Sequence, residues 1–512
     1  MIKFTLGNLK KHQAMELIKK LMMAALTAVA VTACGDDGGS ESTPEAATLQ
    51  KSVPASGEKD VATTTGTIEL TFTSEVNFVS GKEADFNGTK CGMTSFSKSG
   101  NTMTFSIPAQ LKRGETYTLS VPTGFFTTKN GGAEVAAFAV TFSTPEVKAP
   151  SADGIAKELV TTSPLPAAKA VYDYLLSSFG VKTLSSAIAN VNWNTDEADM
   201  VYAATGKYPA IATVDYLHFY TLYDDANRNP YKGGWKVDYE DISQLKAWWD
   251  AGGIVSACWH WNVPNKEAEK YSTDSYTCTP GSGTKNSDGT MTTTFRPKNI
   301  FVEGTWEQKI ASEDLALMAT LLKRFQEAGI PVIWRPLHEA SGNSASGGTA
   351  WFWWGIDGAE TYKQLWRKMF NYFQEQGLNN LIWVWTTQTG YGYDTKKGIV
   401  NDSEWYPGDE YVDVVGRDEY SLTLEQSIAE YEAIRSAFPN KLTTLSECGS
   451  VAKMSEQIAG GAAWSWVMPW YDYDADNTAK SLDKHQHANT QWWKDAMSNE
   501  NVVTRDQLPS FK

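Results

Sequence analysis

Two glutamates stand just after short apolar runs and could act as a pair of acid–base catalysts. Glu339 closes the stretch IWRPLHE, and Glu447 follows the run Leu442–Leu445. Cleaving a glycosidic bond requires one carboxylic acid to protonate the leaving oxygen and a second carboxylate on the opposite face of the sugar. At a carboxyl separation of roughly 5–5.5 Å the second group attacks and the anomeric configuration is retained, whereas a wider gap admits water and inverts it. The pair therefore fits glycoside hydrolysis, provided that the fold brings both residues together.

Polar and aromatic residues follow most of the other apolar runs in this part of the chain. Four more groups stand at such ends: Asp215-Tyr216, Trp259-His260-Trp261-Asn262, Asp418-Glu419-Tyr420 and Trp470-Tyr471-Asp472. Any one of them could belong to an ordinary loop. A buried carboxylate without a partner costs several kcal/mol, so the repeated placement indicates a functional site.

The elements that must position these residues alternate between short apolar runs and amphipathic segments. Segments 312–328 and 361–376 have helical periodicity, the first with a cap at Ser312, and each is followed by a glycine. An early strand near Thr183–Ala189 brings the strands to eight, the others being Ala210–Val214, Gly253–Cys258, Pro331–Trp334, Leu381–Trp385, Val412–Val415, Leu442–Leu445 and Ala462–Met468. Such alternation predicts an α/β fold closed as a (β/α)8 TIM barrel, whose active site lies at the C-terminal strand ends. Glu339 and Glu447 would meet there from strands four and seven.

Residues 47–144 have a different pattern and predict a small all-β domain. Three of its runs alternate apolar and polar residues between turn signals: Gly66–Phe72, Met103–Ile107 and Tyr117–Val121. This pattern favours an antiparallel sandwich, and the stretch resembles bacterial Ig-like modules. All 20 tryptophans lie beyond residue 150, so we favour a spacer over a sugar-binding module. A linker over 145–165 then leads to the predicted catalytic domain, 166–512.

The N-terminus has the pattern of a secretion signal. Two lysines precede the apolar run Leu21–Ala33, which is too short to span a bilayer. The small residues before Cys34 resemble a bacterial lipobox, in which the cysteine is lipidated. We therefore predict a signal peptide over 1–33 and a lipidated, flexible tether over 34–46. The resemblance implies a lipid anchor in the bacterial outer membrane, on the cell surface or the periplasmic face; plain cleavage with Cys34 incidental is the alternative.

The composition and the motifs bear on which partners and cofactors the protein could bind. The formal net charge of −15 disfavours nucleic acid, whose phosphates attract basic surfaces. The sequence has no HExxH motif and no phosphate-binding loop, and His485 and His487 form a lone pair that we expect at the surface. We therefore predict no metal and no cofactor. The cysteine spacing leaves a single Cys258–Cys278 disulfide open.

Three motifs resemble glycoside hydrolase family 26. They are WRPLHE with the aromatic block WFWWG at 351–355, YPGDEYVDVVGRDEY at 406–420 and LSECG at 445–449. The resemblance covers about residues 180–480, and the motifs occur in the family's order. That family consists mainly of endo-β-1,4-mannanases on a (β/α)8 barrel with catalytic glutamates on strands four and seven. The resemblance therefore implies retaining cleavage of β-1,4-mannosidic bonds in mannan, galactomannan or glucomannan, and we expect a monomer.

The resemblance also implies roles for single residues. Glu339 is expected to be the acid/base and Glu447 the nucleophile, with Tyr420 hydrogen-bonded to Glu447. His338 should contact the substrate near its 2-hydroxyl, while Trp351 and Trp470 should be stacking platforms. From their places in and after the strands, we add four residues to the predicted substrate-binding set: His260, Arg335, Asp215 and Trp261.

Some features depart from the family pattern and leave alternatives open. The segment 341–350 is longer than the usual link to the aromatic block, and Glu419 is an additional acid without an assigned role. Another β-glycanase activity of the family, either mixed-linkage glucanase or β-1,3-xylanase, is the nearest rival function. A non-catalytic glycan-capture lipoprotein, which would bind without turnover, is the rival from another class.

Overall fold

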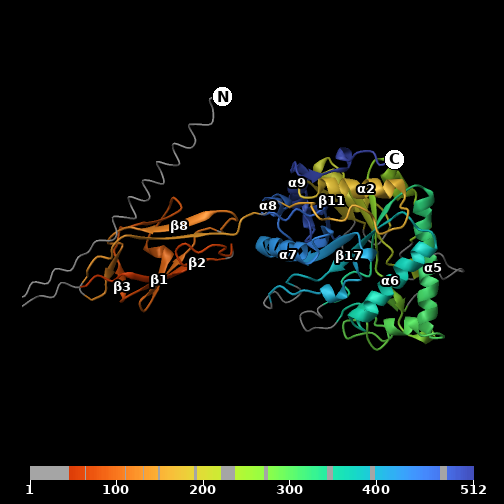
Figure 1. Cartoon of the computed structure of the whole chain (residues 1–512), viewed down its shortest axis with the longest axis horizontal. Helices are drawn as coiled ribbons and strands as arrows, with labels where there is room; N and C mark the ends of the chain where they lie inside the picture. Colours follow the sequence, from red (N-terminus) through yellow and green to blue (C-terminus); the bar gives the residue numbers. More distant parts are fainter. Residues whose placement is uncertain are drawn as a thin grey trace, which may run out of the picture. The chain divides into compact units, whose positions relative to one another are not determined.

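The computed structural model describes residues 45–63, 65–109, 111–130, 132–147, 150–189, 193–220, 237–269, 275–342, 350–391, 398–472 and 481–512. The predicted signal peptide, Cys34 and nearly all of the tether lie outside these residues. The chain forms two compact units, one built from N-terminal strands and the other containing everything from Val140 onward. Figure 1 shows strands without helices in the N-terminal region and strands enclosed by helices in the C-terminal region.

The N-terminal region is an all-β sandwich. Two four-stranded sheets have the orders β1-β2-β7-β6 and β10-β8-β4-β5, and β3 pairs with β9. Adjacent strands run antiparallel in the pairs β1–β2, β6–β7, β4–β5, β4–β8 and β3–β9. The strand bounds are β1 Leu49–Val53, β2 Thr67–Phe72, β3 Val76–Phe78, β4 Ala84–Phe86, β5 Thr89–Cys91, β6 Phe96–Ser99, β7 Thr102–Ser106, β8 Thr116–Val121, β9 Phe126–Thr128 and β10 Phe138–Ser143, with a 3-10 turn η1 at Met93–Ser95.

The alternation seen in the sequence decides which residues enter the sandwich core. In β2, Ile68, Leu70 and Phe72 are buried while the residues between them are more exposed. Phenylalanine rings fill the space, with Phe72 and Phe126 in edge-on contact at 5.3 Å between centroids. The predicted all-β domain is confirmed.

The C-terminal region is a closed barrel of parallel strands. Eight strands follow one another in the order β12-β13-β16-β17-β18-β19-β20-β11, and the pairing of β11 with β12 closes the ring. The strand bounds are β11 Thr183–Ile188, β12 Ile211–Asp215, β13 Ile254–Trp259, β16 Val332–Pro336, β17 Leu381–Thr387, β18 Val414–Tyr420, β19 Leu442–Gly449 and β20 Trp466–Pro469. The predicted TIM barrel is confirmed, and each of the eight predicted strands overlaps one of these.

Helices cover the outside of the barrel (Figure 1). Their bounds are α2 Pro166–Ser178, α3 Asp196–Thr205, α4 Ser243–Asp250, α5 Trp306–Glu327, α6 Ala359–Glu375, α7 Leu424–Ala437, α8 Met454–Ala459 and α9 Thr490–Ser498. Short elements lie between them: β14 Val263–Pro264, β15 Tyr276–Thr277, η3 Glu267–Glu269, η4 Pro297–Phe301, η6 Trp353–Gly355, η8 Ser403–Trp405, η9 Asp409–Tyr411, η11 Leu482–Lys484 and η12 Arg505–Gln507. Within the residues described, no helix has the length and apolar character needed to cross a membrane.

Helix α5 begins earlier than its sequence pattern indicates. Ser312 does not cap it, because its hydroxyl donates to the carbonyl of Gln308 inside the helix. The cap is Thr305, whose side chain accepts from the backbone N–H of Gln308. A serine hydroxyl can satisfy either role, so the sequence alone does not distinguish a cap from an interior turn.

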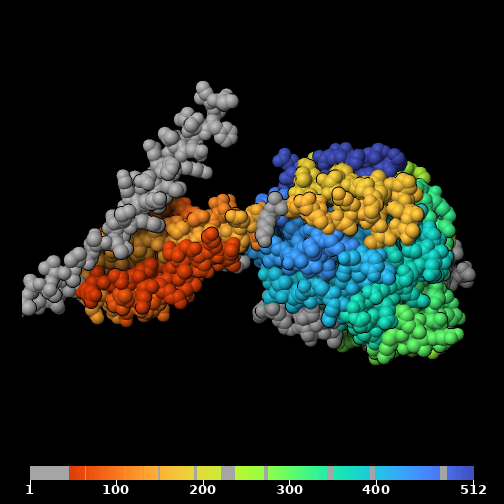
Figure 2. All heavy atoms as spheres, viewed as in Figure 1, coloured from red at the N-terminus to blue at the C-terminus, as the bar shows by residue number. Residues whose placement is uncertain are grey.

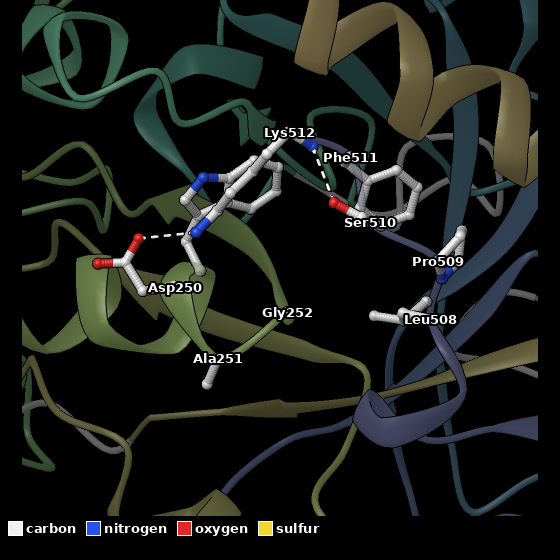
Figure 3. A pocket seen from close by; sticks show the side chains of 9 residues that line it. Asp250, Ala251, Gly252, Leu508, Pro509, Ser510, Phe511 and Lys512 are labelled. Atoms are coloured by element: carbon white, nitrogen blue, oxygen red, sulfur yellow. Dashed lines mark hydrogen bonds and ion pairs between the residues drawn. The ribbon is translucent and has the colours of Figure 1, made fainter.

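The last residues of the chain close the opposite end of the barrel from the strand ends that carry Glu339 and Glu447. Strand β21 (Val502–Val503) adds beside β11, and the ring of Phe511 contacts Tyr174 of α2. In Figure 2 this segment (dark blue) lies against the yellow region that contains α2. A pocket of about 330 Å³ lies here, between the loop that precedes β13 and residues 508–512. Lys512 forms an ion pair with Asp250 across it at 2.8 Å, and Figure 3 shows these lining residues. Because it lies where β13 starts, this pocket is remote from the predicted active site.

Candidate active site

Glu339 and Glu447 stand at the C-terminal ends of β16 and β19, close enough for their charges to interact. Glu339 follows β16 by three residues, and Glu447 lies within the last three residues of β19. The negative charge of Glu447 contributes to the raised pKa of Glu339, and both carboxylates contribute to the raised pKa of Tyr420. The two acids are 108 positions apart in the sequence, yet the fold brings both of them close to Tyr420.

One hydrogen bond and one ion pair hold the carboxylate of Glu447. The Tyr420 hydroxyl donates to its Oε1 at 2.6 Å, and the Arg335 guanidinium forms an ion pair with its Oε2 at 3.0 Å. Burial and the charge of Asp418 raise the pKa of Glu447 to about 7, against the lowering effect of Arg335 and Tyr420. The contacts with Tyr420 and Arg335 thus favour the ionised form of Glu447, which a nucleophile needs.

Arg335 connects several strands inside the barrel. Only 3% of its surface is exposed, and besides Glu447 it forms an ion pair with Asp418 on β18. Its Nε also donates to Thr386 Oγ1 on β17 at 3.1 Å. Asp418 in turn accepts from the Ser446 hydroxyl at 2.8 Å. A buried arginine needs such partners, because an unpaired buried charge is strongly destabilising.

Glu339 has a different environment, which favours its neutral form. Burial, followed by the charges of Asp418 and Glu447, raises the pKa of Glu339 to about 8. The Trp351 indole N–H donates to its Oε2 at 2.8 Å. At neutral pH Glu339 therefore keeps its proton more readily than Glu447 does, which is the difference that an acid and a nucleophile require.

The pKa values of two histidines beside the glutamates shift in opposite directions. Burial favours neutral His260, but the charge and hydrogen bond of Asp215 outweigh it and raise the His260 pKa. Asp215 is also held by the backbone N–H of His260 at 3.0 Å. Burial and the neighbouring charges of His260 and Arg335 lower the pKa of His338 well below its ordinary value, which favours the neutral ring. The ring centroids of the two histidines lie 4.3 Å apart.

One ring nitrogen of His338, Nδ1, could bind a substrate hydroxyl. The side chain is 1% exposed, and its Nδ1 has no hydrogen-bond partner in the part of the chain that the structure describes. A buried polar atom without a partner is rare, and a ligand hydroxyl would satisfy it.

Aromatic rings line the same region. Trp470, partly exposed, lies 5.6 Å from the His260 ring between centroids. Phe352 lies 5.0 Å from the His338 ring and stacks on Trp354 at 4.5 Å. Partly exposed rings beside polar groups suit sugars, whose faces are apolar and whose edges carry hydroxyls. No sequence pattern distinguishes Phe352 from the tryptophans that flank it.

Trp261 requires a correction, because the structure does not bring it to this group. Its ring is fully buried and stacked on Trp259 at 4.2 Å, and its indole N–H donates to Asp314 of α5. His260 faces the barrel mouth, so the residue after it points outward into the helix layer. Of the predicted site residues, the structure groups Glu339, Glu447, His338, His260, Tyr420, Trp351, Trp470, Arg335 and Asp215, and leaves Trp261 in the core.

Four further observations concern histidines, Glu419, cysteines and metal ligands. His485 is buried rather than at the surface, and the His487 ring contacts Tyr420 at 5.4 Å between centroids. Glu419 points away from the barrel interior and accepts from the Ser427 hydroxyl of α7 at 2.6 Å. The cysteines that the structure describes, including Cys258 and Cys278, are free thiols. In the described ranges, no three His, Cys, Asp or Glu side chains are arranged to hold a metal ion.

Comparisons with known proteins agree with this geometry. Residues 160–496 match glycosyl hydrolase family 26, and residues 43–144 match a bacterial Ig-like domain. Mannan endo-1,4-beta-mannosidase B of Piromyces sp is 29% identical over 366 residues, which are 69% of this chain and 54% of that protein. The mannan endo-1,4-beta-mannosidase of Thermothelomyces thermophilus is 31% identical over 312 residues, 60% of this chain and 56% of that protein. The chain thus spans about half the length of the curated relatives it matches.

Solved structures show the same likeness. The GH26 domain of an endo-beta-mannanase/endo-beta-glucanase from Prevotella bryantii is 38% identical with a TM-score of 0.60, covering 69% of this chain and 99% of that one. A beta-mannanase from a symbiotic protist of the termite Reticulitermes speratus is 32% identical with a TM-score of 0.54, covering 70% and 99%. Since the family match covers more than half of its residues, this chain belongs to glycosyl hydrolase family 26.

Proposed function

We propose that the chain is an endo-acting, retaining glycoside hydrolase that cleaves β-1,4-mannosidic bonds in mannan, galactomannan and glucomannan. The observation that carries this proposal is the geometry at the strand ends, where Tyr420 donates to Glu447 and Arg335 forms an ion pair with it, beside a Glu339 whose pKa is raised further than that of Glu447. The relatives described above are named mannan endo-1,4-beta-mannosidases, which supports mannan over other β-glycans.

In the first half-reaction, Glu339 gives its proton to the interglycosidic oxygen as the bond from that oxygen to the anomeric carbon breaks. A carboxylate oxygen of Glu447 forms a new bond to the same carbon from the opposite face, and the leaving sugar departs as an alcohol. Tyr420 and Arg335 fix the orientation of the attacking carboxylate. The product of this step is a glycosyl ester of Glu447.

In the second half-reaction, Glu339 acts as a base. Its carboxylate takes a proton from a water molecule while the water oxygen bonds to the anomeric carbon, and Glu447 leaves as a carboxylate. Two inversions return the original configuration. We assign His338 to a hydroxyl near the reacting carbon, because its Nδ1 is buried and free for such a bond, and we assign Trp470 and Trp351 to sugar faces.

The pH dependence of kcat/KM should be bell-shaped. Activity falls at low pH when Glu447 becomes protonated, and at high pH when Glu339 loses its proton, with the pKa values of the pair at about 7 and about 8. The Tyr420 hydrogen bond lowers the pKa of Glu447, so Tyr420→Phe should move the acid limb to higher pH. Initial rates on a soluble mannan across the pH range check this; an acid limb that stays in place in Tyr420→Phe would contradict the assignment.

The substrate assignment is tested by comparing purified enzyme on mannan, lichenan and xylan. We expect rapid release of mixed oligosaccharides from mannan and rates at least about tenfold lower on the other two, a difference of about 1.4 kcal/mol in transition-state binding. Faster release from lichenan or xylan would favour the rival β-glycanase activities. Binding of mannan without any product would indicate a glycan-capture protein.

We also propose that the enzyme is a lipoprotein of the bacterial outer membrane, with the Ig-like domain as a spacer. The support is the sequence around Cys34, which lies outside the described residues, and the Ig-like match over residues 43–144. In a bacterial host, Cys34→Ser should move the enzyme from the membrane fraction to the soluble fraction, because a thioether-linked lipid can no longer form at that position. Immunoblots of the two fractions measure it, and an unchanged distribution would refute the lipid anchor.

A further inference from the structure

The turn that carries Glu339 has an unusual backbone. Leu337 and Glu339 have φ angles of 49° and 50°, in the left-handed region that residues with a side chain rarely adopt. Such a conformation is strained unless surrounding contacts compensate. Without restraint, the segment after β16 would relax and turn the Glu339 carboxyl away from its present position.

Side-chain donors from one later segment hold this turn. The Tyr362 hydroxyl of α6 donates to the carbonyl of Leu337 at 3.1 Å, and the Trp354 indole N–H of η6 donates to the carbonyl of His338 at 2.9 Å. The carbonyl of Glu339 accepts from the backbone N–H of Gly342 at 2.9 Å. Three consecutive carbonyls of the turn are therefore fixed, two of them by fully buried aromatic side chains.

The same segment also packs tightly against the residues that follow Glu339. A Cβ at Gly355 would lie 1.9 Å from the carbonyl oxygen of Ala340, so the η6 backbone approaches the turn as closely as glycine allows. Farther along, the Ser341 hydroxyl donates to buried Asp402 at 2.8 Å. The turn thus has little freedom to change its backbone while η6 and α6 stay in place.

We propose that Trp354 and Tyr362 are positioning residues for the acid/base: by holding the carbonyls of His338 and Leu337, they keep the left-handed turn that aims the Glu339 carboxyl at the scissile oxygen. This inference rests on the proposed function, since it needs Glu339 to transfer the proton. Three aromatic residues then act on Glu339 in two ways. Trp351 bonds to the carboxyl itself, whereas Trp354 and Tyr362 act through the backbone.

Loss of either donor would slow the first half-reaction in a way that depends on the leaving group. When the C–O bond breaks, the proton of Glu339 must reach the leaving oxygen, and a shifted carboxyl delivers it late or not at all. A phenol that is already a good leaving group departs as a phenolate without that proton. The defect should therefore depend on the leaving group, which a general loss of folding does not.

The experiment compares kcat/KM for two aryl β-mannobiosides, one with 2,4-dinitrophenol and one with unsubstituted phenol as the leaving group. The constant kcat/KM reports the steps up to formation of the glycosyl-enzyme. Tyr362→Phe keeps the ring and removes only the hydroxyl, whereas Trp354→Phe replaces the indole by a smaller aromatic ring; each removes one donor. We expect each variant to lose about tenfold or more on the phenyl glycoside, a part of the roughly 10²–10⁴-fold that a general acid supplies, and to stay within about threefold on the dinitrophenyl glycoside.

Trp353→Phe is the matched control. Trp353 is the neighbouring residue of η6, is equally buried, and donates its indole N–H to the carbonyl of Trp261 at 2.7 Å, away from the turn. Its variant should keep the wild-type ratio between the two glycosides. A thermal unfolding midpoint for each variant shows how much stability each lost donor contributes.

Equal losses on both glycosides in Trp354→Phe and Tyr362→Phe, or the same leaving-group dependence in Trp353→Phe, would overturn the inference. If Trp354→Phe does not fold, Tyr362→Phe decides alone, because it removes a single oxygen. An inactive wild type would overturn the proposed function, and the inference with it. An active wild type with an unchanged ratio in the variants overturns the inference only.

Discussion

Glutamine at position 447 should reduce kcat on mannan by about 10⁴-fold or more, because losing a nucleophile removes the covalent route altogether. Glutamine has the size of glutamate, so the Tyr420 hydroxyl keeps an acceptor while the attacking charge disappears. Arg335 stays paired through Asp418, which preserves its buried ion pair. Initial rates of reducing-sugar release, with thermal unfolding as a test of folding, measure the effect.

Glu419→Gln provides the matched control for this change. Glu419 is also a buried glutamate, on the adjacent strand β18, and pairs with Cys448 in the register of β18 and β19. Its side chain contacts Ser427 of α7 on the outer side of the barrel. We expect its activity to stay within a few-fold of wild type. Wild-type-like rates in Glu447→Gln would remove the basis of the proposed mechanism.

Removal of Glu339 should give a different defect. In Glu339→Ala, hydrolysis of mannan should fall by roughly 10²–10⁴-fold, the usual contribution of a general acid–base group. A dinitrophenyl mannobioside should still form the glycosyl-enzyme, because its leaving group needs no proton. The second half-reaction then lacks its base, so the intermediate accumulates and dinitrophenol appears in a burst.

A stopped-flow measurement of dinitrophenol release separates the two glutamates. Glu339→Ala should show a burst followed by slow turnover, and added azide should accelerate the slow phase, since azide attacks without a general base. Glu447→Ala should show no burst. A burst in Glu447→Ala would exchange the roles assigned to the two residues.

The barrel and the main acids could be predicted from the sequence because both depend on short-range patterns. The run Leu442–Leu445 (LTTL) carries no charge where the barrel wall is buried, and Glu447 follows where the strand reaches the mouth. The two acids did not need to be near each other in the sequence, since the ring of parallel strands brings their ends together.

Side-chain direction beyond a strand end was harder to predict. Strand alternation indicates which residues face inward, but it stops at the last paired residue. His260 and Trp261 both follow β13, and only the first faces the mouth. In β19, Ser446 is an extra residue between the pairs Arg417–Leu445 and Asp418–Glu447, and both Ser446 and Glu447 bond to groups of β18, so the direction of these two side chains could not be predicted from spacing.

Contacts between distant segments were the least predictable part of the site. His487 contacts Tyr420 across 67 positions of sequence, and no local pattern connects the two. Trp351 is predicted to stack on a sugar, and its indole N–H also bonds to Glu339, a contact that the sequence did not predict. Aromatic residues in a row carry several kinds of chemistry, and only their three-dimensional neighbours distinguish a platform from a hydrogen-bond donor.

The buried cluster around Arg335 places two carboxylates against one guanidinium. Arg335 forms ion pairs with both Asp418 and Glu447, while Asp215 is bonded to His260 and the raised pKa of Glu339 favours its protonated form. The sugar ring becomes oxocarbenium-like as the bond breaks, and so gains positive charge beside this cluster. Fixed charges in a dry site act strongly on such a change and need no reorientation. The barrel interior is therefore charged in advance to attract the transition state more than the neutral polysaccharide.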